Sequence, residues 1–159
     1  QLNKMKTIKR VQLVVLIVMV GIASATFTSC QKKGCTDPNA NNYSSKAKKD
    51  DGNCTYPVIN VSGTGKSGDI SGAGGTASKT FKFTNSNSTI GWDMSINSSS
   101  GSFQLVLKDA SGATLVDKTL TGGSGPQSAS GTSYSGTAVS WTCIITLTKF
   151  TSSGDYSFL

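Results

Sequence analysis

The sequence contains no histidine and no glutamate, and all eight of its acidic residues are aspartates. Histidine is the commonest general base in enzymes and a frequent zinc ligand, so its absence removes the usual routes to acid–base and zinc catalysis. No serine lies in a Gly-x-Ser-x-Gly motif, and the scattered aspartates form no pair with the spacing of a glycosidase. The composition therefore predicts a protein that is not an enzyme.

The excess of positive charge is concentrated near the N-terminus. The formal net charge is +7, but four positive charges lie within the first ten residues and two more at Lys32 and Lys33. Residues 57–159 carry six lysines and five aspartates. Because this part of the chain has no basic stripe, binding to nucleic acid is not expected.

The first 29 residues have the layout of a secretory signal. A basic start is followed by an apolar run over residues 11–27 and by small residues near its end. The strongest apolar block, residues 13–20, is short, whereas a membrane-spanning helix needs about 20 apolar residues. We expect a signal helix in residues 1–29, with residues 1–4 lying upstream of the true start at Met5.

The end of this run, Phe-Thr-Ser-Cys at residues 27–30, resembles a bacterial lipobox, with phenylalanine where leucine is usual. The resemblance implies that Cys30 becomes the N-terminus and carries diacylglycerol and an acyl chain such as palmitate, with residues 30–33 as a lipidated tether. Gln31, in place of an aspartate, favours the outer membrane, facing either the periplasm or the exterior. An ordinary cleaved signal and a retained transmembrane anchor are the alternatives.

Residues 34–56 read GCTDPNANNYSSKAKKDDGNCTY and resemble a small cysteine-bounded module of secreted and surface proteins from Bacteroidota. The shared pattern is GCTD, then NY, then DDG-x-CTY. This resemblance and an oxidising compartment together imply a disulfide between Cys35 and Cys54. Closing a loop of this length stabilises a small unit by about 3 kcal/mol in the chain-entropy model. We expect the module to act as a spacer.

Three aspartates of the module, Asp37, Asp50 and Asp51, are candidate calcium ligands because the disulfide would bring its two ends together. An EF-hand is excluded, since a loop starting at Asp37 has Asn42 where glycine is required and Lys48 where glutamate is required. The alternative is that these side chains cap turns by hydrogen-bonding local backbone. No other cofactor is predicted.

Residues 57–159 predict an antiparallel β-sandwich of about seven strands, because apolar residues alternate with polar ones between turn signals. A hairpin turn is expected at residues 108–112, a long loop or an irregular edge at residues 62–78, a loop at residues 121–137, and a turn at residues 152–155. The inward faces are expected to contain Phe81 and Phe83; Ile90, Trp92, Met94 and Ile96; Phe103, Leu105 and Leu107; and Trp141, Cys143, Ile145 and Leu147.

The final pattern, W-x-C-x-I-x-L followed by GDYSFL, resembles the closing hairpin of secreted jelly-roll-like sandwiches, including prepeptidase C-terminal-type domains. In such domains the last strand continues further, so we expect a chain truncated within that strand and an unpaired edge. Trp92 and Trp141 are predicted core residues rather than sugar-stacking platforms. Cys143 is a predicted buried thiol, and Tyr134 is the better candidate for an exposed aromatic.

These features predict a non-catalytic, lipid-anchored protein of the outer membrane, structural or adhesive, in which an all-β sandwich follows a signal helix and a disulfide-bounded module. The alternative is a membrane-tethered module that binds carbohydrate or calcium. The expected partners are the membrane, through the lipid, and a glycan or another envelope protein. No ligand-binding residue of the sandwich can be named from the sequence.

Overall fold

The computed structural model describes residues 31–159. The expected signal helix and the lipidation site at Cys30 lie outside these residues. In the described part of the chain, no helix is long and apolar enough to cross a membrane. The element order there is β1 (Val58–Ile59), β2 (Ser67–Asn85), β3 (Gly91–Lys108), β4 (Thr114–Thr121), β5 (Gln127–Thr132) and β6 (Val139–Phe158).

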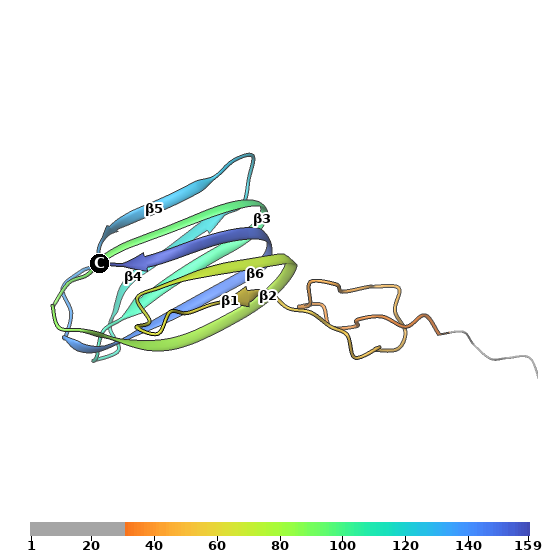
Figure 1. Ribbon diagram of the computed structural model, residues 1–159, viewed down its shortest axis with the longest axis horizontal. Coiled ribbons are helices and arrows are strands. Elements are labelled where there is room, and N and C mark those ends of the chain that lie inside the picture. Colours follow the sequence, from red (N-terminus) through yellow and green to blue (C-terminus); the bar gives the residue numbers. More distant parts are fainter. Residues whose placement is uncertain (1–30) are drawn as a thin grey trace, which may run out of the picture. The chain divides into compact units, whose positions relative to one another are not determined.

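All strand pairings are antiparallel, which confirms the predicted all-β fold. The strand order is β1-β2-β6-β3-β4, and β5 also pairs with β3. The three long strands, β2, β3 and β6, bend and pass from one layer of the sandwich to the other (Figure 1). One hydrogen-bonded sheet therefore supplies both layers.

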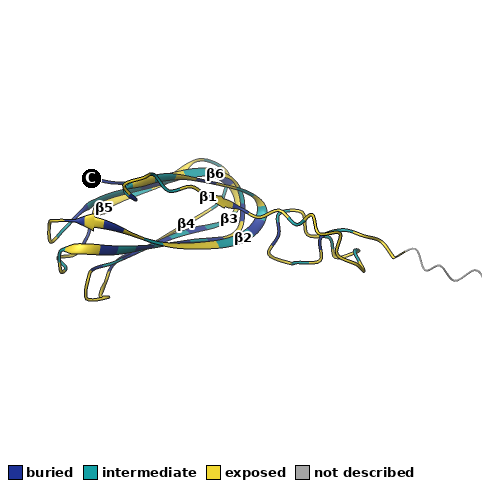
Figure 2. Ribbon diagram, turned by 60° about the horizontal axis from the view of Figure 1, so that its bottom comes forward, coloured by how far each residue is buried: buried dark blue, intermediate teal, exposed yellow. Residues whose placement is uncertain are grey.

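The registers define the two layers. Layer 1 contains β1, residues 67–73 of β2, residues 153–158 of β6, residues 91–97 of β3, and β5. Layer 2 contains residues 77–85 of β2, residues 139–148 of β6, residues 102–108 of β3, and β4. Figure 2 shows the two layers of ribbon, with buried positions alternating with exposed ones along the strands.

Each long strand bends where its ladder is interrupted. The register shifts in β2 around Gly75 and in β3 between Asn97 and Ser102. Left-handed backbone occurs at Gly74, Gly101, Lys149 and Ser152, all within these bends. Bulges and left-handed residues increase local bending, which lets a strand turn a corner between two sheets.

The core lies between the layers and confirms most of the predicted inward faces. Phe103, Leu105, Leu107, Trp141, Cys143, Ile145 and Leu147 have no exposed surface. Trp92 is only partly buried and packs at the margin of the core. The indole nitrogen Nε1 of Trp141 donates to the carbonyl of Thr137 at 2.9 Å, so the polar atom of this buried ring is satisfied.

Residues 62–78, expected to be a long loop or an irregular edge, contain the start of β2 at Ser67 and the register shifts around Gly75. Three other predictions for the C-terminal part are wrong. The predicted loop at residues 121–137 contains β5. The expected turn at residues 152–155 lies inside the continuous strand β6. The final strand is not an unpaired edge, because β6 lies between β2 and β3 and pairs with both.

Candidate functional site

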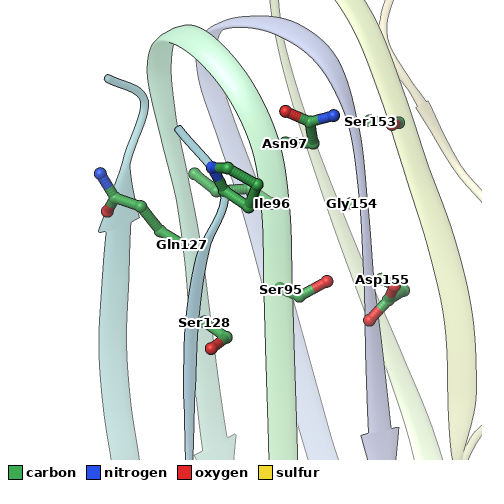
Figure 3. Close-up of a pocket in the computed structure, with 9 residues that line it drawn as sticks. Ser95, Ile96, Asn97, Gln127, Ser128, Ser153, Gly154 and Asp155 are labelled. Carbon is green, nitrogen blue, oxygen red and sulfur yellow. The ribbon is translucent and has the colours of Figure 1, made fainter. Parts of the chain in front are cut away.

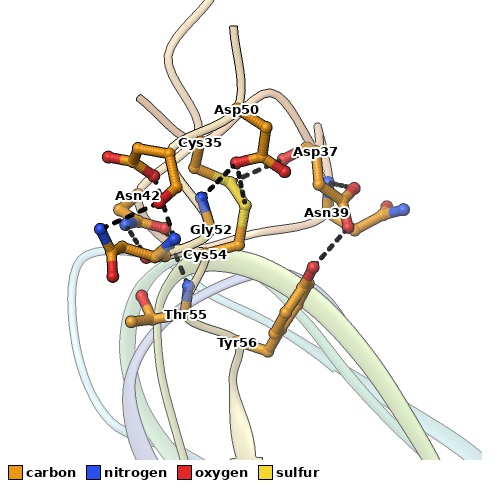
Figure 4. Close-up of a disulfide and its surroundings, with 11 residues drawn as sticks. Cys35, Asp37, Asn39, Asn42, Asp50, Gly52, Cys54, Thr55 and Tyr56 are labelled. Atoms are coloured by element: carbon orange, nitrogen blue, oxygen red, sulfur yellow. Dashed lines mark hydrogen bonds between the residues drawn. A yellow bond between two sulfur atoms is a disulfide. The ribbon is translucent and has the colours of Figure 1, made fainter. Parts of the chain in front are cut away.

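The disulfide between Cys35 and Cys54 is present, as predicted, with a Cα–Cα distance of 5.0 Å (Figure 4). Cys35 is buried, so one side of the bridge is shielded inside the small module. Cys143 is the free thiol of the described residues. It lies in the core of the sandwich, where burial raises its pKa to about 12 and keeps it protonated.

The three aspartates of the module each cap a local turn. Carboxylate oxygens of Asp37, Asp50 and Asp51 accept from the backbone amides two residues further on, at 2.8, 3.1 and 3.0 Å. Asp37 also accepts from the Tyr56 hydroxyl at 2.7 Å. Within residues 31–159, no group of three metal-ligating side chains is gathered. This geometry matches the turn-capping alternative.

The charge on Asp37 is stabilised by these contacts. The backbone amide of Asn39, and then the hydroxyl of Tyr56, lower the pKa of the Asp37 carboxyl. The same hydrogen bond to Asp37 raises the pKa of Tyr56. Both effects favour an acceptor carboxylate facing a protonated phenol at neutral pH. The pair closes the end of the module next to the sandwich.

The module, expected as a spacer, is hydrogen-bonded to the sandwich. The side-chain oxygen of Asn41 accepts from the amides of Ala73 and Gly75, at 3.0 and 3.1 Å. The Asn39 carbonyl accepts from the amide of Thr76 at 2.8 Å, and the Pro38 carbonyl accepts from Lys149 Nζ at 2.6 Å. The module therefore binds at the bends of β2 and β6.

A buried carboxylate, Asp109, fastens the turn after β3 to the loop before β6. It is 5 % exposed and accepts from the amides of Ser111, Ala113 and Thr137, at 3.0, 2.9 and 2.7 Å. The hydroxyl and amide of Ser111 and the amides of Thr137 and Ala113 lower its pKa to about 2. The turn signal at residues 108–112 predicted the hairpin, but nothing in the sequence indicated its link to Thr137.

The solvent-facing side of layer 1 is lined with polar side chains. In paired strands, directly opposite residues point to the same face. The register joins Asp69 to Asp155, Asp155 to Ser95, and Ser95 to Ser128. Asn60 extends this row, because its Nδ2 donates to Asp69 Oδ2 at 2.8 Å. Parallel rows contain Ser67, Ser157, Asp93 and Ser130, and Ser71, Ser153 and Asn97.

Two hollows involve this face, and both are lined by Asp155. The first, of about 260 Å³, lies over β5, β3 and β6, and Figure 3 shows Ser95, Asn97 and Gln127 among its lining residues. The second, of about 550 Å³, lies next to β2 and is lined by Asn60 and Asp69 among others. We call these two hollows, which share Asp155 as a lining residue, the polar groove.

The two faces of the sandwich differ in charge. The strand segments of layer 1 contain Asp69, Asp93 and Asp155 but no lysine or arginine. In layer 2 the register places Lys82 and Lys108 on either side of Thr142. The groove therefore lies on an acidic face, which attracts cations and neutral donors and repels anions.

The predicted aromatics take different positions. Trp141 is fully buried, as expected for a core residue. Tyr134 is 80 % exposed, as expected, but it lines neither hollow of the polar groove. The groove was missed from the sequence because serine, asparagine and aspartate on the wet side of a strand look the same whether they bind a ligand or only water.

The described part of the chain is an all-β sandwich, and the disulfide module that precedes it is hydrogen-bonded to the bends of β2 and β6. No protein-family model matches the sequence. No curated protein matches it either.

Proposed function

We propose that this chain is a non-catalytic, lipid-anchored protein of the bacterial cell envelope, with a structural or adhesive role. Its sandwich would be held at the outer membrane through diacylglycerol on Cys30. The proposal rests on the sequence of residues 1–30, in which a basic start, an apolar run and a lipobox-like ending follow one another. Two or more acyl chains make membrane attachment stable, so a lipoprotein of this kind would remain on its membrane.

The observation that best supports export is the state of the cysteines. Cys35 and Cys54 form a disulfide, whereas Cys143 is enclosed in the core. Disulfides persist in oxidising compartments such as the periplasm and the cell surface and are rare in the cytosol. Cys30 is thereby left as the cysteine with a separate role, which fits its lipobox-like setting.

A non-catalytic role is supported by the chemistry of the chain. It has no histidine and no glutamate, and the carboxylate with the most strongly shifted pKa, Asp109, accepts the hydrogen bonds that hold a turn. The exposed serines therefore have no histidine partner that could activate them as nucleophiles.

Detergent phase separation of bacterial membranes tests the proposal. The wild-type chain is expected in the detergent-rich phase, and Cys30→Ser is expected in the aqueous phase or as an uncleaved precursor. Cys143→Ser is the matched control, which removes a thiol but keeps the lipid. A processed, water-soluble wild-type protein would contradict the anchor. A Cys30→Ser chain of wild-type length and partitioning would indicate a retained transmembrane segment instead.

A further inference from the structure

We propose that the polar groove on layer 1 binds a glycan chain that carries no anionic groups. This inference rests on the adhesive role proposed above, for which it supplies the ligand class and the binding surface. The ligand would lie across the strands, along the row from Asn60 to Ser128. Its contacts would be centred on Asp155, which lines both hollows.

The chemistry of the groove matches a ligand rich in hydroxyl groups. Hydroxyl side chains both donate and accept, amides offer two donors and an acceptor, and carboxylates accept. The first hollow presents all three types, through Ser95, Asn97 and Asp155. These side chains form no hydrogen bond with other residues in the described part of the chain, so their donors and acceptors face solvent. A sugar hydroxyl can serve as either partner at each position.

The size of the groove fits a chain rather than a single small molecule. Four inter-strand spacings of about 4.8 Å separate Asn60 from Ser128, which gives a span of about 19 Å. The larger hollow, of about 550 Å³, falls within the usual range for ligand sites of about 300–1,000 Å³. The smaller one, of about 260 Å³, lies just below that range. Both are open to solvent, and Asp155 lines both.

Other ligand classes fit the groove less well. A peptide anchored by apolar side chains would need an exposed apolar pocket. The three outward rows contain serine, asparagine and aspartate, and Ile96 and Tyr156, which also line the hollows, are buried. A nucleic acid would need positive charge, and these strand segments contain no lysine or arginine. Asp69, Asp93 and Asp155 on this face would repel sulfated glycans and glycans of uronic acids.

One groove alone would bind weakly. Its rows contain no aromatic side chain, and Tyr156, which lines the second hollow, is buried, so no ring is available to stack on a sugar. Many copies held on one membrane would compensate, since linked weak sites gain affinity through effective concentration. We expect millimolar affinity for one groove and one oligosaccharide. Adhesion would then depend on the density of the anchored protein.

The test is an NMR titration of the full chain in detergent micelles with defined hexasaccharides. The neutral probes are hexamers of glucose, mannose, galactose and N-acetylglucosamine, and the anionic probe is a hexamer of a uronic acid. At least one neutral hexamer should shift the amides of Asp69, Ser95 and Asp155, and the uronate should not. The inference falls if no neutral hexamer shifts these amides, or if the uronate binds as well.

Two variants locate the site. Asp155→Ala should weaken binding of the active hexamer by about tenfold or more, as should Ser128→Ile, which places a branched apolar side chain, with no ring to stack on a sugar, at the margin of the first hollow. Thr142→Ala, on the outer face of layer 2, is the matched control and should bind as the wild type does. Unchanged thermal midpoints would show that the variants are folded. Equal binding by all four proteins would overturn the assignment to the groove.

The two proposals can fail separately. A lipidated chain that binds no hexasaccharide would support the lipid anchor and refute the glycan site. A chain that binds a neutral hexamer through Asp155 but carries no lipid would support the glycan site and refute the lipid anchor.

Discussion

The side-chain oxygen of Asn41 accepts a hydrogen bond from the main-chain amide of Gly75 at 3.1 Å, although 34 residues separate them. Gly75 lies between two register shifts where β2 leaves layer 1, and it is buried there. A Cβ atom at Gly75 would lie 2.6 Å from this asparagine oxygen. The disulfide module thus completes the hydrogen bonding of the bend, and only glycine allows it to come this close.

Asn41→Ala should lower the free energy of unfolding by about 1–3 kcal/mol, because the buried amide of Gly75 would lose its acceptor. Chemical denaturation followed by tryptophan fluorescence measures this change. Asn39→Ala is the matched control, since Asn39 contacts Thr76 through its main-chain carbonyl, which alanine retains. A loss that is equally large in both variants would contradict the role of the Asn41 side chain.

Reduction of the disulfide should destabilise the module and then the bend to which it is bound. Cys35 and Cys54 are 19 residues apart, and opening a loop of that length costs about 3 kcal/mol in the chain-entropy model. Urea denaturation with and without reductant should show a lower midpoint in the reduced protein. The double variant Cys35→Ser, Cys54→Ser should resemble the reduced protein and not respond to reductant. An identical midpoint in both states would refute a stabilising disulfide.

Glycine at position 101 is required by the bend of β3. Its φ is +82°, and a Cβ atom there would collide with the carbonyls of Thr148 and Lys149. Gly101→Ala should therefore cost about 1–2 kcal/mol for the left-handed backbone and a further about 1–3 kcal/mol for overpacking. Gly112 has a φ of +89° with open space around it. Gly112→Ala should therefore lose only the free energy that the left-handed backbone costs, with no loss from overpacking. Thermal unfolding of both variants measures the difference.

The carboxylate of Asp109 should make stability depend on pH in the acid range. Its pKa is lowered to about 2 in the folded chain, whereas an unfolded aspartate titrates near about 3.9. The unfolded state therefore binds more protons between these values, and stability falls as pH drops from about 4 towards 2. Asp109→Asn should be less stable than wild type at pH 7, and the difference in the free energy of unfolding should become smaller on acidification. A difference that stays constant from pH 7 to pH 2 would contradict this.

The parts of the fold that were correctly predicted rest on period-two apolar patterns. Apolar residues at every second position from Trp141 to Leu147 predicted that four side chains point into the core, since only one register of such a strand buries all four. The Asp–Gly turn signal at residues 109–112 correctly marked the hairpin between β3 and β4. The positions of Cys35 and Cys54 at the two ends of a short module correctly indicated the disulfide between them.

Other elements could not be predicted, because their cause is not local. Residues 67–73 lack a regular apolar pattern, yet they form a strand since β6 pairs with them along their length. Ser152, Ser153 and Gly154 have turn-like composition, but β6 only bends there, held by β2 and β3 on both sides. The contact between Asn41 and Gly75 depends on the folded positions of two distant segments, and no spacing in the sequence signals it.

The central claim is that Cys30 carries the lipid that holds this sandwich at the membrane. Mass spectrometry of the N-terminal peptide, from protein purified out of bacterial membranes, tests it most directly. We predict a mature chain that begins at Cys30 and carries the added mass of diacylglycerol, with or without an amide-linked acyl chain. An unmodified Cys30, or a chain that retains the leader, would contradict the claim.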